Sequence, residues 1–140
     1  MKSVDVLIAA RAKVAKHWHQ GGMYFDTEDG EGSFCAAGAL QYVHGFDGAQ
    51  TPMRAIKGAI KYINAVLRKI TPPGRRPRAH LGSGIAFHSI TYWNDSEGRT
   101  QQEVLAVFDA AIKNAKRRHI NGGRKKVAAN ISRFVAIRSS

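Results

Sequence analysis

One segment of this chain carries an apolar pattern that a helix explains and a strand does not. Apolar side chains recur there at steps of three and four, at Met53, Ile56, Ile60, Ile63, Leu67 and Ile70. This spacing places them on one face of a helix with 3.6 residues per turn. Pro52 suits the first turn, and the segment Thr71-Pro72-Pro73-Gly74 ends the helix. The apolar face must be buried, so the pattern requires other elements to pack against it.

Helix signals also precede this segment. Ser3 is a candidate N-cap for a helix over about residues 4–18, and Ser33 is one for a short helix over about residues 35–44. The small side chains of the short helix indicate close packing against a neighbour. The acidic, glycine-rich segment 26–32 is typical of a hairpin turn or an exposed loop.

Further elements are predicted after it. Residues 85–93 alternate enough for a short strand. Thr100 and Glu103 form a capping box that opens a helix. The segment Asn121-Gly122-Gly123 is expected to break that helix, and residues 124–138 have the pattern of a final one.

These signals predict a mainly α protein, with a compact helical domain of four to five helices and at most a small β-hairpin. We place the domain at residues 1–118 and a basic C-terminal extension, expected to be helical, at residues 119–140. A chain of 140 residues that is 44% apolar can bury a sizeable single core. Its apolar runs are too short to span a bilayer, so no membrane partner is expected. The single cysteine excludes an internal disulfide framework and a Cys-rich zinc site, which fits a cytoplasmic protein.

The charge of the chain is arranged in blocks. Between Asp47 and Asp95 there are eight Lys or Arg and no carboxylate, and after Asp109 there are nine more basic residues and again no carboxylate. The formal net charge of +12 therefore comes from two acid-free stretches. Ordinary solvent-exposed faces intersperse both signs, so the pattern favours an anionic partner over charge that serves only solubility.

Nucleic acid is the partner class that these stretches favour. We predict a cationic stripe along residues 53–70, a basic loop after it and a third patch near the C-terminus. The candidate phosphate contacts are Arg54, Lys57, Lys61, Arg68, Lys69, Arg75, Arg76, Arg78, Lys116, Arg117, Arg118, Arg124, Lys125 and Lys126. Contacts of this kind supply affinity without reading base sequence. Aromatic residues are sparse in these segments, so no stacking platform for single strands is evident.

We therefore expect a small, non-enzymatic accessory protein that binds nucleic acid or a nucleoprotein assembly, without a cofactor or metal. The expected location is the cytoplasm of a bacterial host cell. Two alternatives stay open. One is a phage inhibitor that binds an acidic host protein, and the other is a Cys-dependent hydrolase or transferase.

The enzymatic alternative depends on Cys35. A thiol at a helix start is stabilised as the reactive thiolate by backbone N–H groups and the helix dipole. His88 and then Asn94 and Asp95 follow it along the chain, which is the order of catalytic residues in papain-like cysteine peptidases. On the simpler interpretation, Cys35 is a small apolar residue between two helices. Asn94 and Asp95 then tie a turn to the start of the next helix.

The histidines show no spacing typical of metal ligands. His17 and His19 flank Trp18, so on a helix their side chains point to different sides. If the helix ends there and the chain extends, the two could face the same side. We predict no metal site, and we expect Trp18 and Trp93 to anchor the core.

Three motifs occur in order along the chain: C-A-A-G-A-L at 35–40, W-N-D at 93–95 and R-T-Q-Q-E-V-L-A-V-F-D-A-A-I at 99–112. Together they resemble a small family of uncharacterised bacterial and bacteriophage proteins, in which a tryptophan, here Trp18, precedes C-x-x-G-A-L, W-N-D and R-T-x-x-E-V-L. The resemblance spans about residues 10–115. It implies a compact, largely helical domain and brings no established activity. By this comparison, the basic loop at 75–78 and the tail after Arg117 are additions in this chain.

Overall fold

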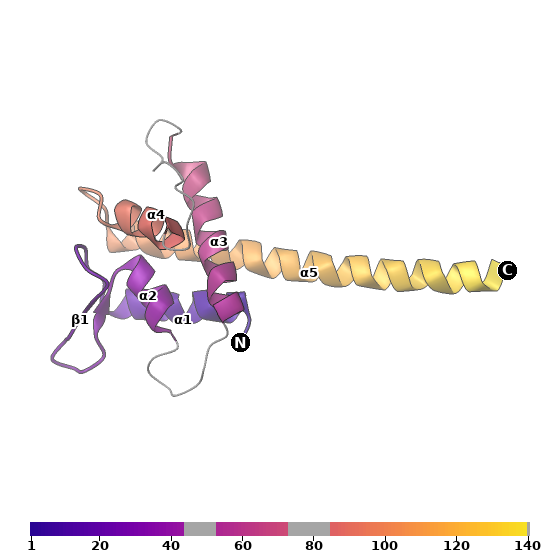
Figure 1. The fold of residues 1–140 in the computed structure, drawn as a ribbon, viewed down its shortest axis with the longest axis horizontal. Helices are drawn as coiled ribbons and strands as arrows, with labels where there is room; N and C mark the ends of the chain where they lie inside the picture. The colour runs from indigo at the N-terminus through magenta and orange to yellow at the C-terminus, as the bar shows by residue number, and fades with distance from the viewer. Residues whose placement is uncertain (44–52, 73–84, 140) are drawn as a thin grey trace.

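The computed structural model describes residues 1–43, 53–72 and 85–139, with the backbone alone for residues 85–87, 119 and 122–139. Its elements are α1 (Ser3–Lys16), β1 (Tyr24–Phe25), β2 (Ser33–Phe34), α2 (Ala36–Tyr42), α3 (Met53–Ile70), α4 (Ile85–Asn94) and α5 (Gln101–Ser139). The two strands form an antiparallel hairpin. The first half of α5 lies among the other helices, and its second half projects away from them (Figure 1). The predicted mainly α fold with a small hairpin is confirmed.

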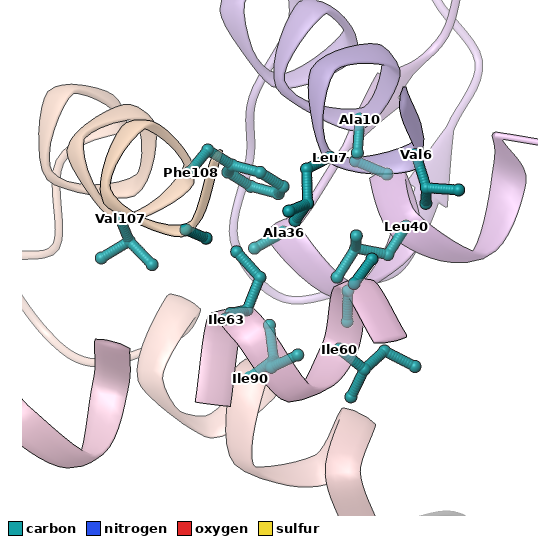
Figure 2. Close-up of a cluster of buried hydrophobic side chains, with 14 of the residues drawn as sticks. Val6, Leu7, Ala10, Ala36, Leu40, Ile60, Ile63, Ile90, Val107 and Phe108 are labelled. Carbon is teal, nitrogen blue, oxygen red and sulfur yellow. The ribbon is translucent and has the colours of Figure 1, made fainter. Parts of the chain in front are cut away.

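The core lies where the five helices meet. α1 packs against α2, α3 and α5, and α4 packs against α2 and α3. Each helix contributes a large apolar side chain to this junction (Figure 2), and Leu7, Leu40, Ile63, Ile90 and Phe108 are all 1% exposed or less. Burial of one such side chain stabilises the fold by about 1.5–3 kcal/mol, so tertiary packing rather than local propensity holds these helices in place.

α3 has the bounds that its apolar spacing predicts. Ile56, Ile60, Ile63 and Leu67 are buried, whereas Met53 and Ile70 at the two ends are 62% and 53% exposed. The opposite face of the helix is thereby left to solvent. This arrangement sets the orientation of the basic residues described below.

The first two helices begin and end slightly differently from the prediction. α1 begins at Ser3, with Lys2 rather than Ser3 as its N-cap, and it ends at Lys16. The chain after it is extended and pairs with β2 at Trp18. The N-cap of α2 is Cys35, whose Sγ accepts a hydrogen bond from the Gly38 backbone N–H at 3.2 Å. Ser33 does not cap this helix, because it lies in β2 opposite Phe25.

Close packing of α2 against its neighbour is confirmed at Gly38. A Cβ atom built there would overlap the carbonyl of Met23. The helix and the residue that precedes β1 can approach this closely only because position 38 has no side chain.

The short strand predicted over residues 85–93 is wrong, because these residues form α4. Strand alternation would put Ile90 and Tyr92 on the same face, yet Ile90 is fully buried and Tyr92 is 64% exposed. Ile90 and Trp93 are buried together, at the spacing of one helical turn. β-branched and aromatic residues favour strands only when a pleated surface is available to pack them, and here the neighbours are helices.

The helix break predicted at Asn121-Gly122-Gly123 is also wrong. The capping box at Thr100 and Glu103 opens α5 as predicted, with the Glu103 carboxylate accepting from the Thr100 backbone N–H at 3.0 Å. The helix then continues to Ser139. Glycine lowers helix stability by about 1 kcal/mol, but unlike proline it keeps its backbone N–H donor and makes no clash. The boundary expected between residues 118 and 119 therefore falls inside one continuous helix.

Candidate nucleic-acid interface

The predicted cationic stripe exists on α3. Arg54, Lys57, Lys61, Arg68 and Lys69 are all exposed. The first four follow one another at steps of three, four and seven residues, which keeps them on the face opposite the buried isoleucines. The rise of an α-helix puts Arg68 about 21 Å along the axis from Arg54.

Three of these cations line an open groove with a fourth from another helix. Its volume is about 680 Å³, and its lining combines α3, the start of α1 and one residue of α5. Arg54, Lys57 and Lys61 form the α3 wall, and Arg118 comes from α5. The other lining residues are Ser3, Met53, Gly58, Tyr62 and Ala65. We call this feature the α3–α5 groove.

Arg118 reaches the groove because of its position around α5. Ala111 and Ala115, one turn apart, are buried against the bundle. Successive helical residues are rotated by about 100°, so Lys116, Arg117 and Arg118 point in three different directions. Arg118 alone of the three lines the groove, whereas Lys116 and Arg117 are exposed elsewhere. The described half of the third patch, residues 116–118, is therefore divided around the helix.

The groove cations are not neutralised by the described part of the chain. Within residues 1–43, 53–72 and 85–121, Arg54, Lys57, Lys61 and Arg118 form no ion pair. α3 has no carboxylate of its own, because the chain has none between Asp47 and Asp95. Only a carboxylate from another element could form an ion pair with the α3 cations. In the described part of the chain, none pairs with the four groove cations.

The acidic loop of the hairpin makes its contacts with α1 and its own strands instead. Glu31 forms an ion pair with Lys16, and the Asp29 carboxylate lies 2.6 Å from Nε2 of His17. Hydrogen bonds from the Thr27 hydroxyl, His17 and the Glu31 backbone hold the pKa of Asp29 well below its ordinary value. These contacts hold the carboxylates of Glu31 and Asp29 within the hairpin and the end of α1.

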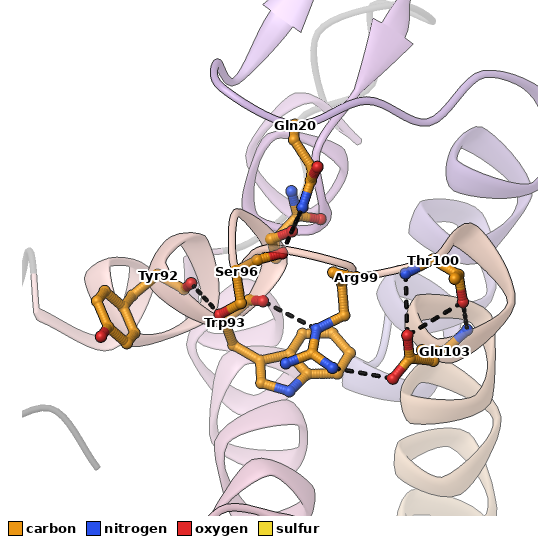
Figure 3. Close-up of polar contacts among 8 residues, drawn as sticks. Gln20, Tyr92, Trp93, Ser96, Arg99, Thr100 and Glu103 are labelled. Atoms are coloured by element: carbon orange, nitrogen blue, oxygen red, sulfur yellow. Dashed lines mark hydrogen bonds and ion pairs between the residues drawn. The ribbon is translucent and has the colours of Figure 1, made fainter. Parts of the chain in front are cut away.

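Two carboxylates within residues 95–109, those of Asp109 and Glu103, are also engaged elsewhere. Asp109 forms an ion pair with Arg11, at 2.6 Å between Oδ1 and Nε. Arg99 binds Glu103 and also donates to the Trp93 carbonyl, with its guanidinium 4.1 Å from the Trp93 ring centroid (Figure 3). These contacts fasten the α4–α5 connection, and the hydrogen bond from the Thr100 N–H lowers the pKa of Glu103.

The side chains of the remaining predicted phosphate contacts lie outside the described part of the chain. Arg75, Arg76 and Arg78 lie outside the described residues. The backbone of α5 includes Arg124, Lys125 and Lys126, whose side chains are also outside the description. The candidate interface is therefore the α3–α5 groove together with the exposed Arg68 and Lys69.

The residues of the enzymatic alternative differ in their exposure. Cys35 is fully buried, and His88 on α4 is exposed. Burial raises the pKa of the Cys35 thiol, although the N–H groups of Gly38 and Ala37 act in the opposite direction, and the charge of Asp95 raises the pKa further. A raised pKa keeps the thiol protonated at neutral pH, whereas a nucleophilic cysteine needs the thiolate. Hydrolase or transferase activity stays an untested alternative.

Asn94 and Asp95 hold this region together. Asn94 is fully buried, and its Oδ1 accepts hydrogen bonds from Trp18 Nε1 at 2.7 Å and from the Ala36 backbone N–H at 3.0 Å. Its Nδ2 donates to the His19 carbonyl. The Asp95 carboxylate accepts from the Gly21 N–H at 3.0 Å. The C-A-A-G-A-L and W-N-D motifs thus meet at one hydrogen-bonded junction, which accounts for both in structural terms.

The histidines after α1 have local partners. Because α1 ends at Lys16, His17 and His19 are not on a helix, and each bonds to a different part of the hairpin. Nδ1 of His19 lies 2.7 Å from Ser33 Oγ, and His17 contacts Asp29. Among the described residues, no group of three or more His, Cys, Asp or Glu side chains is arranged to hold a metal ion.

Tyr62 is the groove residue that sequence reasoning did not find. It follows Lys61 on α3, is half-buried, and packs partly against the core while lining the groove. From the sequence it was indistinguishable from an ordinary core aromatic beside a basic stripe. Its position at the edge of the apolar face, next to a predicted phosphate contact, is the signal that could have indicated it.

The comparisons with known proteins place the chain in a family without assigning a function. Residues 1–114 match the model of DUF6197, a family of unknown function. The chain belongs to this family. No curated protein and no solved structure matches it. The family match ends before Arg118, so one wall of the groove and the projecting part of α5 lie beyond it. Among the described residues, no helix is long and apolar enough to cross a membrane.

Proposed function

We propose that this DUF6197 protein binds nucleic acid, or a nucleoprotein surface, through the α3–α5 groove. The supporting observation is that four cations from two helices line one open groove, without an acidic partner in the described part of the chain. Phosphates would supply the missing counter-charges. The contacts would act on the backbone and would not read base sequence.

Arg54 gives a second argument. It lies in the first turn of α3, which contains no acidic residue. The helix dipole makes this end positive, so a cation there is unfavourable by a few tenths of a kcal/mol to about 1 kcal/mol. A bound phosphate would interact favourably with both the dipole and the guanidinium. The placement of Arg54 costs stability in the free protein and is useful when an anion is bound.

The salt dependence of binding tests the proposal. Each phosphate contact contributes about −0.9 to the slope of log affinity against log salt for duplex DNA. Four groove contacts should therefore weaken binding about a hundredfold between about 50 and 200 mM salt, and six or more contacts about a thousandfold. Fluorescence anisotropy with labelled DNA and RNA measures this slope. An undetectable or salt-insensitive interaction would contradict the proposal.

A matched pair of variants separates the groove from general positive charge. The quadruple variant R54Q/K57Q/K61Q/R118Q removes the groove cations. Its control, K113Q/K116Q/R117Q, removes three exposed cations of α5 that lie outside the groove. We expect the groove variant to lose about three units of slope and the control to keep most of it. Equal losses would assign binding to diffuse charge rather than to the groove.

A pull-down with and without nuclease distinguishes nucleic acid from the alternative partner, an acidic host protein. Under our proposal, the captured material is lost on nuclease treatment or in high salt. A partner that survives both, and is lost in the groove variant alone, would assign the groove to a protein instead.

A further inference from the structure

Tyr62 adds an aromatic side chain to the cations that line the α3–α5 groove. It is adjacent to Lys61 along α3, and both line the groove with Arg118 of α5. The residue is half-buried, and it packs against the hydrophobic core from the groove side. An aromatic ring anchored in this way loses little further freedom when a ligand stacks on it.

We infer that the groove binds single-stranded nucleic acid, with one base stacked on Tyr62 and the flanking phosphates on Arg54, Lys57, Lys61 and Arg118. The inference rests on the proposed function and names its substrate class. Proteins that bind single strands combine a cationic groove along the backbone with aromatic side chains that stack on bases. The groove contains both elements.

A single strand fits these observations better than a duplex. Inside a duplex, both faces of each base are covered by neighbouring bases, so Tyr62 would find a free base face only at the duplex ends. An unpaired base has an exposed face, and stacking on it does not depend on its identity. The expected binding therefore tolerates any sequence.

A polymer also fits better than a free nucleotide. The groove is open rather than enclosed, and exposed cations continue past it along α3 to Arg68 and Lys69. From Arg54 to Arg68 this row is about 21 Å long, which is longer than one nucleotide needs. A strand of several nucleotides could contact the whole row.

The test uses the whole 140-residue chain and a labelled oligo-dT of about 12 nucleotides, with a duplex of the same length as comparison. We expect the single strand to bind more tightly. Tyr62→Leu, which keeps an apolar side chain against the core, should weaken single-strand binding by about fivefold to a hundredfold. The salt slope should stay unchanged, because no cation is removed. Tyr62→Phe keeps the ring and should bind like the wild type.

Crosslinking gives a readout that does not depend on how well the Leu variant folds. An oligonucleotide carrying 5-iodouracil, irradiated on the wild-type protein, should crosslink to Tyr62, as mapped by mass spectrometry. If Tyr62→Leu binds as well as the wild type and no crosslink forms at Tyr62, the inference is overturned. The proposed function survives that result if the groove-charge variant still loses its salt slope. If the wild-type protein binds no nucleic acid at all, both the inference and the proposed function are overturned.

Discussion

At the scale of single residues, Asn94 links three segments of the chain that lie far from it in the sequence. Its amide joins the indole of Trp18, the first turn of α2 at Ala36 and the extended segment at His19. A buried polar group is tolerated only when its hydrogen-bonding capacity is used, and among the described residues no buried side-chain polar atom lacks a partner. The sequence placed Asn94 in a turn. These three partners lie 58 to 76 residues away along the chain, so only the folded structure identifies them.

Asn94→Ala should therefore destabilise the fold strongly. It removes the partner of the buried Ala36 N–H and of two part-buried groups, the Trp18 indole N–H and the His19 carbonyl, and a buried group left unsatisfied costs about 1–3 kcal/mol. We expect the free energy of unfolding to fall by about 3 kcal/mol or more, measured by urea denaturation. Tyr92→Ala on the same helix is the control, because Tyr92 is 64% exposed and its removal should change stability little. Similar small effects for both variants would contradict the role of Asn94.

Cys35 gives a second prediction at this scale. Burial raises the pKa of its thiol, so at neutral pH the folded protein should carry less thiolate than an exposed cysteine does. Iodoacetamide should label Cys35 slowly in the native protein and rapidly once urea has unfolded it. Fast labelling of the native protein with an apparent pKa below about 8.5 would instead support the Cys-dependent enzyme.

At the scale of elements, the hairpin shows how a two-strand sheet is held in a helical protein. An isolated hairpin is marginal in water. Here the extended residues after α1 pair with β2, since the Phe34 N–H donates to the His17 carbonyl at 2.9 Å. The contact between His17 and Asp29 and the ion pair between Lys16 and Glu31 fasten its loop to the end of α1. The turn was predictable from its acidic and glycine residues, but its attachment to α1 was not.

The hairpin should loosen in acid. The pKa of Asp29 is lower in the folded state than in the unfolded chain, chiefly because the Thr27 hydroxyl and His17 bind its carboxylate. The stability from Asp29 is therefore fully present above about pH 4 and is lost as the pH falls below that value toward the folded pKa. Amide NMR signals of residues 24–34 should report this loosening, and Asp29→Asn should show it already at neutral pH. Signals that stay unchanged in both cases would exclude this attachment.

The helices differ in how far their sequences predicted them. α3 was predictable because its own apolar spacing matches the face that its neighbours bury. α4 was not, because its β-branched and aromatic residues favour a strand until packing against α2 and α3 decides otherwise. The continuity of α5 through Gly122 and Gly123 was missed because a loss of helix propensity is not a break.

At the scale of the whole molecule, the acidic loop and the groove cations lie in different regions. The acidic loop lies in the hairpin, at the end of the molecule away from the projecting half of α5 (Figure 1). The groove cations lie on α3 and α5. This separation leaves a positive region that can attract a polyanion from a distance.

The projecting part of α5 should be dispensable for folding. The described buried residues of α5 are Val104, Val107, Phe108, Ala111 and Ala115, and all precede the projection. A chain truncated after Asn121 keeps Arg118 and loses five basic residues. We expect its thermal midpoint to change by no more than about 5 °C, with weaker nucleic-acid binding and retained crosslinking at Tyr62. A large drop in the midpoint, measured by circular dichroism, would show that the extension is part of the fold.

The sequence by itself determined the helical class, the bounds of α3, the capping box of α5 and the placement of cations in acid-free stretches. These features are local, because each depends on residues within a few turns of one another. The tertiary structure alone decided that Arg118 meets Arg54, Lys57 and Lys61 across a groove, and that Tyr62 lies among them. Such a site depends on the angle and rotation at which two distant helices pack. Those are set by core contacts whose partners are far apart along the chain.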